Sequence, residues 1–149
     1  MPRSFCEGLV ARVQGDAGAA SAAFTSARSE MENVLRDQPE YAEGLCLIGM
    51  IDAGLGRKEE ALREGRLAAE LLPVAKDAMT GQEILRNLAI TYAWVGEKDL
   101  AFKQLEELLP VYGPISYGQL KLHPWWDPLR NDPRFERIIE EAKKPVALK

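Results

Sequence analysis

Apolar residues recur along this chain at the three- and four-residue spacing of amphipathic helices, in paired segments that meet at glycines. The clearest pair meets at Gly96, and similar pairs meet at Gly15 and Gly56. The apolar positions around Gly96 are Ile84, Leu85, Leu88, Ala89, Tyr92 and Val95 before it, and Leu100, Ala101, Leu105 and Leu108 after it. The pattern predicts three helical hairpins, each turning at a glycine.

Local signals predict where these helices begin and end. The first should run from about Ser4 to Gln14 with Ser4 as its N-cap, and the second from Ala17 to about Asp37, before Pro39. The second hairpin should comprise Pro39–Leu55 and Lys58–Leu72, and a connector at Val74–Gly81 leads into the third. On the helix after Gly56, the predicted buried positions are Ala61, Leu62, Ala68, Ala69 and Leu72, and the exposed ones are Glu59, Arg63 and Arg66.

Small residues recur in register with the turns. Gly8 and Ala20, Gly49 and Ala61, and Ala89 and Ala101 are each twelve residues apart, and the turn glycine follows the first member by seven. The turn glycines are 41 and 40 residues apart. Because small side chains let helix backbones approach closely, we expect Gly49 and Ala61 to face each other across a helix crossing.

The pattern changes after Pro114. Three prolines between residues 117 and 135 predict short helical turns and extended chain. Asp132 and Pro133 then form a helix start, with Asp as the cap and Pro at the first helical position. Phe135, Ile138, Ile139 and Ala142 give this last helix an apolar stripe, which we expect to lie on the last hairpin. Residues after Pro145 are expected to fray.

The spacing of Leu45, Ile48, Gly49 and Asp52, followed by Ala61, Gly65, Ala68 and Pro73, resembles the tetratricopeptide repeat (TPR). The resemblance implies an all-α fold: three TPR-like hairpins in a right-handed superhelix, or α-solenoid, with a C-terminal capping helix. Residues 1–149 would form one domain, with repeats at about 1–38, 39–73 and 80–112 and a tail and capping helix at 115–145. TPR proteins bind other proteins, so the implied function is a protein–protein interaction scaffold or regulatory module.

The tail carries a second resemblance. HPWWDPLRNDPRF is similar to the segment that ends many TPR regions of bacterial signalling proteins, through Asp127, Pro128 and Leu129 and the run from Arg130 to Phe135. This implies a bacterial protein with a docking or sensory role. Trp125 and Trp126 would cap the last repeat or, if exposed, form a contact surface.

Composition limits the function classes. The chain has 149 residues, 46% of them hydrophobic and 28% charged, with a net charge of −4, which is a globular balance and unfavourable for nucleic-acid binding. No apolar run has the length of a membrane span or a signal peptide. Cys6 and Cys46 have no metal-ligand spacing, are expected to be at least half-buried, and favour a reducing, cytoplasmic setting.

Catalytic chemistry has little support in the residues. His123 is the sole histidine, and it has no nucleophile or metal-ligand partner at a workable spacing. Glycine-rich phosphate loops are absent from the sequence. We therefore expect no enzyme activity, no catalytic residues, no metal and no cofactor.

A TPR array is concave on the side of each repeat's first helix. Aligning the three repeats places a largely apolar set in this groove: Phe5, Leu9, Arg12, Glu43, Cys46, Met50, Arg86, Asn87, Ile90 and Trp94. These residues could bind a protein or peptide, with Trp94 as an anchor. They could instead be covered by the chain's own tail or by a twin subunit in a homodimer, or hold an apolar small molecule or lipid anion beside Arg86.

Overall fold

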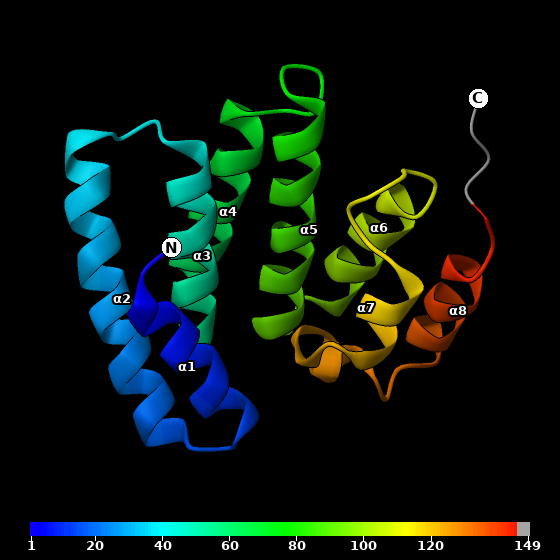
Figure 1. The fold of residues 1–149 in the computed structure, drawn as a ribbon, viewed down its shortest axis with the longest axis horizontal. Helices are drawn as coiled ribbons and strands as arrows, with labels where there is room; N and C mark the ends of the chain where they lie inside the picture. Colours follow the sequence, from blue (N-terminus) through cyan, green and yellow to red (C-terminus); the bar gives the residue numbers. More distant parts are fainter. Residues whose placement is uncertain (146–149) are drawn as a thin grey trace.

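The computed structural model describes residues 1–145, and every regular element within them is a helix (Figure 1). The expected fraying after Pro145 lies outside the described residues. The elements are α1 (Arg3–Val13), α2 (Ala17–Asp37), α3 (Ala42–Gly54), α4 (Lys58–Leu71), α5 (Ala78–Trp94), α6 (Lys98–Leu108), α7 (Tyr117–Leu122), the 3-10 helix η1 (Pro124–Leu129) and α8 (Pro133–Ala142).

The three predicted hairpins are present as α1/α2, α3/α4 and α5/α6, and each packs most extensively within itself. Their turns repeat one backbone conformation, with φ near 75° at Gly15 and Gly56 and 82° at Gly96. Glycine adopts this left-handed conformation without the steric cost that a Cβ would bring. Successive hairpins contact one another through α2 on α3 and through α3 and α4 on α5, so the chain advances from α1 and α2 at one end to α8 at the other (Figure 1).

Two helix starts differ from the sequence prediction. Ser4 is not an N-cap: α1 begins one residue earlier, at Arg3, and the Ser4 hydroxyl instead donates to Glu30 on α2 at 2.6 Å. The third helix begins at Ala42 rather than Pro39, because residues 39–41 form a turn after α2. Ser4 thus forms a contact between helices instead of capping α1, and Pro39 belongs to a connecting turn instead of starting α3.

The close crossing of α3 and α4 is confirmed. A Cβ built on Gly49 would lie 3.1 Å from the backbone nitrogen of Gly65 and 3.2 Å from the carbonyl oxygen of Ala61. Gly8 takes the corresponding position in the first hairpin, where a Cβ would lie 2.7 Å from the Phe24 ring. Small residues at these positions therefore set the distance between the two helices of a hairpin.

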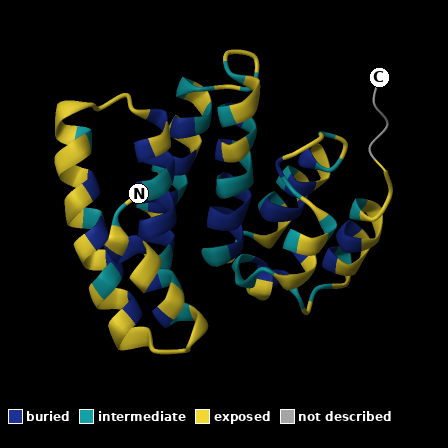
Figure 2. Ribbon diagram, viewed as in Figure 1, coloured by how far each residue is buried: buried dark blue, intermediate teal, exposed yellow. Residues whose placement is uncertain are grey.

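The C-terminal tail packs on the third hairpin, as its apolar stripe predicts. α8 contacts α6 and α7, and η1 contacts α5. Trp126, Leu129 and Phe135 are fully buried and belong to the same core as the hairpins, which runs through the molecule as buried positions on each helix (Figure 2). The Asp132 cap is confirmed, since its side chain accepts from the backbone N–H of Arg134.

Two arginines fix the course of the tail. Arg130 donates to the carbonyl oxygens of Lys121 and His123, both at 2.8 Å, and to the Asp127 carboxylate at 2.7 Å. Arg134 pairs with Asp99 on α6 at 2.5 Å and lies 4.3 Å from the centre of the Phe102 ring. These contacts explain why the segment from Asp127 to Phe135 holds one shape although it contains little regular helix.

Candidate functional site

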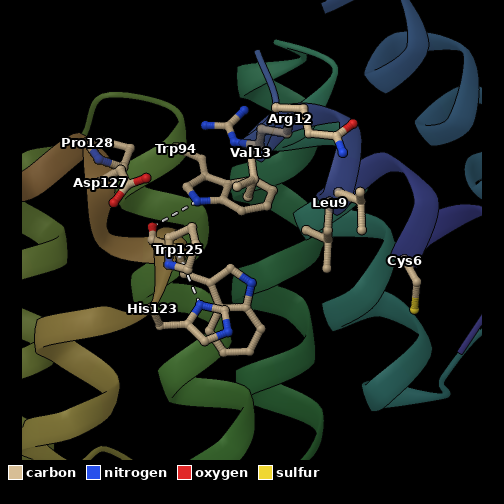
Figure 3. A pocket seen from close by; sticks show the side chains of 12 residues that line it. Cys6, Leu9, Arg12, Val13, Trp94, His123, Trp125, Asp127 and Pro128 are labelled. Carbon is tan, nitrogen blue, oxygen red and sulfur yellow. Dashed lines mark hydrogen bonds between the residues drawn. The ribbon is translucent and has the colours of Figure 1, made fainter. Parts of the chain in front are cut away.

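A hollow lies between the first helix and the tail, and we call it the α1–η1 cleft (Figure 3). Its volume is about 950 Å³. It is lined by Cys6, Leu9, Val10, Arg12, Val13 and Gln14 of α1 and its end, Trp94 of α5, and His123, Pro124, Trp125, Asp127 and Pro128 of the tail. Segments far apart in the sequence therefore build one site with mostly apolar walls.

Trp94, the last residue of α5, forms the floor between the two sides of the cleft. Its indole nitrogen donates to the backbone oxygen of Trp125 at 3.0 Å (Figure 3). Its ring centre lies 6.4 Å from that of the fully buried Phe24, and the Arg12 guanidinium lies 4.2 Å from the same Trp94 ring centre. The half-buried Trp94 thus joins the first hairpin, the third hairpin and the tail.

Arg12 and Asp127 are the oppositely charged groups of the cleft. Burial lowers the pKa of Arg12 from its ordinary value, and the charge of Asp127 acts in the opposite direction. The two nevertheless form no ion pair within 4 Å, because Asp127 accepts instead from Arg130 at 2.7 Å. Among the described residues, the Arg12 side chain has no hydrogen-bond acceptor.

His123 stacks on Trp125, with ring centres 3.9 Å apart. Its Nδ1 accepts from the backbone N–H of Trp125 at 3.3 Å, which leaves the proton of the neutral ring on Nε2. Burial, together with the charge of Arg86, lowers the pKa of His123, so the ring is neutral at pH 7. His123 therefore orients the tail and contributes a donor.

A second hollow, of about 240 Å³, lies between α3 and α5, and we call it the α3–α5 hollow. Trp125 lines both hollows and so separates them. Arg86 donates to the side chain of its neighbour Asn87 at 3.3 Å and lies 5.8 Å from the centre of the Trp125 ring. Cys46 is buried at its base, which raises the pKa of this thiol to about 11 and makes it unreactive at neutral pH.

The structure brings nine of the ten predicted groove residues to these hollows. Leu9, Arg12 and Trp94 line the α1–η1 cleft, while Phe5, Glu43, Cys46, Met50, Arg86 and Asn87 line the α3–α5 hollow. Ile90 lines neither, because it is fully buried in the core. Phe5, Cys46 and Met50 are also at least 97% buried, so they form a base rather than an open surface.

Sequence reasoning did not assign the tail's side of the cleft. His123, Trp125, Asp127 and Pro128 line it together with α1. The sequence marks this segment only by its composition, in which His123 and Trp125 stand next to a proline. The spacing of its residues does not indicate which helix the segment contacts. The expectation for Cys6 was wrong: it is exposed at the edge of the cleft, because the face of α1 that carries it points away from α2.

The most deeply buried charges lie elsewhere. Asp52 on α3 is fully buried, and its Oδ1 accepts from Arg28 on α2 at 2.6 Å and lies 3.5 Å from Arg57. Burial, and next to it the neighbouring carboxyl group of Asp52, raises the pKa of Glu64 on α4 to about 7. Paired carboxyls occur in hydrolytic sites, but neither hollow reaches these two, so the cluster ties α2, α3 and α4 together.

No protein-family model, curated protein or solved structure matches this chain. Within residues 1–145, no group of His, Cys, Asp or Glu side chains is placed to hold a metal ion. Among the helices of that same range, none combines the length and apolar character that a membrane crossing requires. The α1–η1 cleft with its neighbouring hollow is thus the candidate functional site.

Proposed function

We propose that this chain is a TPR-like helical-repeat module that binds a peptide segment of a partner protein in the α1–η1 cleft. The observation that carries the proposal is the cleft itself: about 950 Å³, mostly apolar walls, and a half-buried tryptophan at its floor. Aromatic anchors in partly desolvated pockets supply most of the affinity at many protein interfaces. The TPR-like spacing of the repeats supports the same class of function.

The dimensions of the cleft suit a short stretch of extended chain. Its α1 wall runs from Cys6 to Gln14. At 1.5 Å per residue these eight steps span about 12 Å, and four extended residues span about 13 Å. Val10 and Val13 are 56% and 61% exposed beside the cleft, which adds apolar surface for the ligand to cover. An exposed apolar patch next to a hollow is typical of a protein-binding surface.

Selection from a random peptide library displayed on phage, followed by binding measurements on synthetic peptides, tests this function. Val13→Glu places a charge in the cleft and should weaken peptide binding by tenfold or more. Leu122→Glu is the matched control, because Leu122 is also exposed and also the last residue of its helix, but lies outside the cleft. Failure to select any peptide, or equal binding by wild type and Val13→Glu, would contradict the proposal.

The rival functions give different results. If the exposed valines serve homodimerisation, sedimentation over a wide concentration range should show a dimer that Val13→Glu dissociates. If the cleft holds a lipid or another apolar small molecule, native mass spectrometry of the purified protein should show a retained mass that Val13→Glu loses. Either result, without peptide binding, would replace the proposed function.

A further inference from the structure

Arg12 is held in an unusual state for an arginine on a protein surface. It is half-buried, and its guanidinium carbon lies over the Trp94 ring, 4.2 Å from the ring centre. A cation–π contact with the ring satisfies none of the N–H groups by an ordinary hydrogen bond, and a guanidinium carries five donors. Among the described residues none accepts from them, so part of the hydration of this charge is lost without replacement.

None of the described groups around Arg12 forms an ion pair with it. The charge of Asp127 acts on Arg12 from within the cleft, but no ion pair forms within 4 Å, and Asp127 Oδ1 accepts from Arg130 instead. Gln14 is uncharged, and His123 is neutral with its free nitrogen as a donor. On α1 itself, Glu7 pairs with Arg3 at 2.8 Å. The cleft therefore combines apolar walls with unpaired donors, and a ligand that fits it should bring an acceptor.

The position of Arg12 along the cleft indicates where that acceptor belongs. Val13 and Gln14 line the wall on one side of it, and Leu9 and Cys6 line the wall on the other. A bound chain would thus continue past Arg12 in both directions. This arrangement favours a carboxylate side chain within a segment over the carboxylate at the end of a chain.

We propose that the peptide bound in the α1–η1 cleft carries an aspartate or glutamate that pairs with Arg12, one or two residues from an apolar side chain packed against Trp94. This inference rests on the proposed function of the cleft. A carboxylate accepts two parallel hydrogen bonds from a guanidinium edge, and such charge-assisted pairs are stronger than neutral hydrogen bonds. The stacking on Trp94 would hold the guanidinium in place for this pairing.

The test begins with the peptides selected on wild-type protein, synthesised with amidated C-termini so that side chains supply the carboxylates. Their aligned sequences should share an acidic residue beside an aromatic or branched aliphatic one. Replacing that acid by its amide and Arg12 by glutamine then forms a double-mutant cycle. Each single change should weaken binding about tenfold, and the second change should add little once the first is present.

Arg36→Gln is the control variant. It removes the same charge in the last turn of α2, at a residue that lines neither hollow, so it measures the general electrostatic effect without touching the cleft. Circular dichroism and the melting midpoint establish that Arg12→Gln is folded. Arg12→Lys should recover little affinity, because an ammonium neither stacks nor forms the paired contact.

The outcomes separate the two proposals. Selected peptides without a shared acid, or with no coupling to Arg12 in the cycle, would overturn the inference and leave the peptide-binding function in place. Peptides that bind only with a free C-terminus would likewise overturn it, because the carboxylate would then come from the chain end. Failure to select any peptide would overturn both.

Discussion

The indole nitrogen of Trp94 donates a hydrogen bond to the backbone oxygen of Trp125 at 3.0 Å, and this bond joins the last residue of α5 to the tail. Trp125 in turn separates the two hollows. The tail therefore lies between the two hollows and forms one wall of the α1–η1 cleft.

We expect Trp94→Phe to loosen this wall. Phenylalanine keeps an aromatic ring against Phe24 and under Arg12 but has no N–H to donate. Loss of the bond should lower the free energy of unfolding by about 1 kcal/mol. Acrylamide should then quench the fluorescence of Trp125 more strongly, while the fully buried Trp126 stays protected. Unchanged quenching and stability would show that packing alone holds the tail.

The α3–α4 crossing should tolerate no side chain at Gly49. Gly49→Ala would bring its Cβ to 3.1 Å from a backbone atom of Gly65, and backbone moves less readily than a side-chain tip. We expect a loss of about 1–3 kcal/mol, and at least as much for Gly49→Leu. Gly18→Ala is the control, because that Cβ would meet nothing closer than 3.7 Å on the exposed side of α2. Equal midpoints in denaturant for the two alanine variants would contradict this account of the crossing.

The buried pair of Glu64 and Asp52 should make stability depend on pH. The pKa of Glu64 is about 7 in the folded chain against 4.5 for the unperturbed group, so between these values the folded state holds a proton that the unfolded state has released. Stability should therefore fall as pH rises from about 4.5 through 7, by on the order of 2–3 kcal/mol.

Glu64→Gln isolates this effect, because glutamine has no proton to lose. The variant should be more stable than wild type at pH 8 and close to it at pH 5, as measured by urea denaturation. Glu106→Gln, at an exposed position on α6, should run parallel to wild type at both pH values. A wild-type profile that stays parallel to that of Glu64→Gln from pH 5 to 8 would show that Glu64 is ionised throughout this range in the folded state.

The last helix should be structural. Phe135 is fully buried between the tail and the third hairpin, so Phe135→Ala should cost about 3–5 kcal/mol. Arg137→Ala, on the exposed side of the same helix, should cost little. Removal of residues 131–149 takes away Ile138 and Ile139 as well and should cost an amount comparable to the whole stability of a domain. A truncated chain with an unchanged melting midpoint would show that α8 is an appendage.

The helices and their turns follow from local chemistry that the sequence displays. Gly15, Gly56 and Gly96 mark the turns because a left-handed backbone favours glycine, and Asp132 and Pro133 mark a helix start for equally local reasons. The second helix was predicted from Ala17 to Asp37, and these are its bounds. The pairing of helices within each hairpin also follows, because a short turn leaves few other arrangements for two apolar faces.

Which residues line the candidate site could be determined only from the tertiary structure. Repeat spacing placed Leu9, Arg12 and Trp94 on one side, but it placed Ile90 there as well, and that residue faces the core. The register of a helical face is known from sequence only to within about one residue, since 3.6 residues per turn leaves neighbouring positions about 100° apart. The burial of Asp52 with Arg28, 24 residues away, likewise leaves no local signature.

What the sequence determined by itself is therefore the set of helices, their turns and the apolar side of each, because these depend on contacts between residues close in the chain. What only the tertiary structure decided is that the tail faces the first helix across the cleft, and that none of the described residues accepts a hydrogen bond from Arg12. That return brings α1 within reach of residues more than a hundred positions later in the chain. Such a contact depends on how whole helices pack, and the pattern of neighbouring residues does not record it.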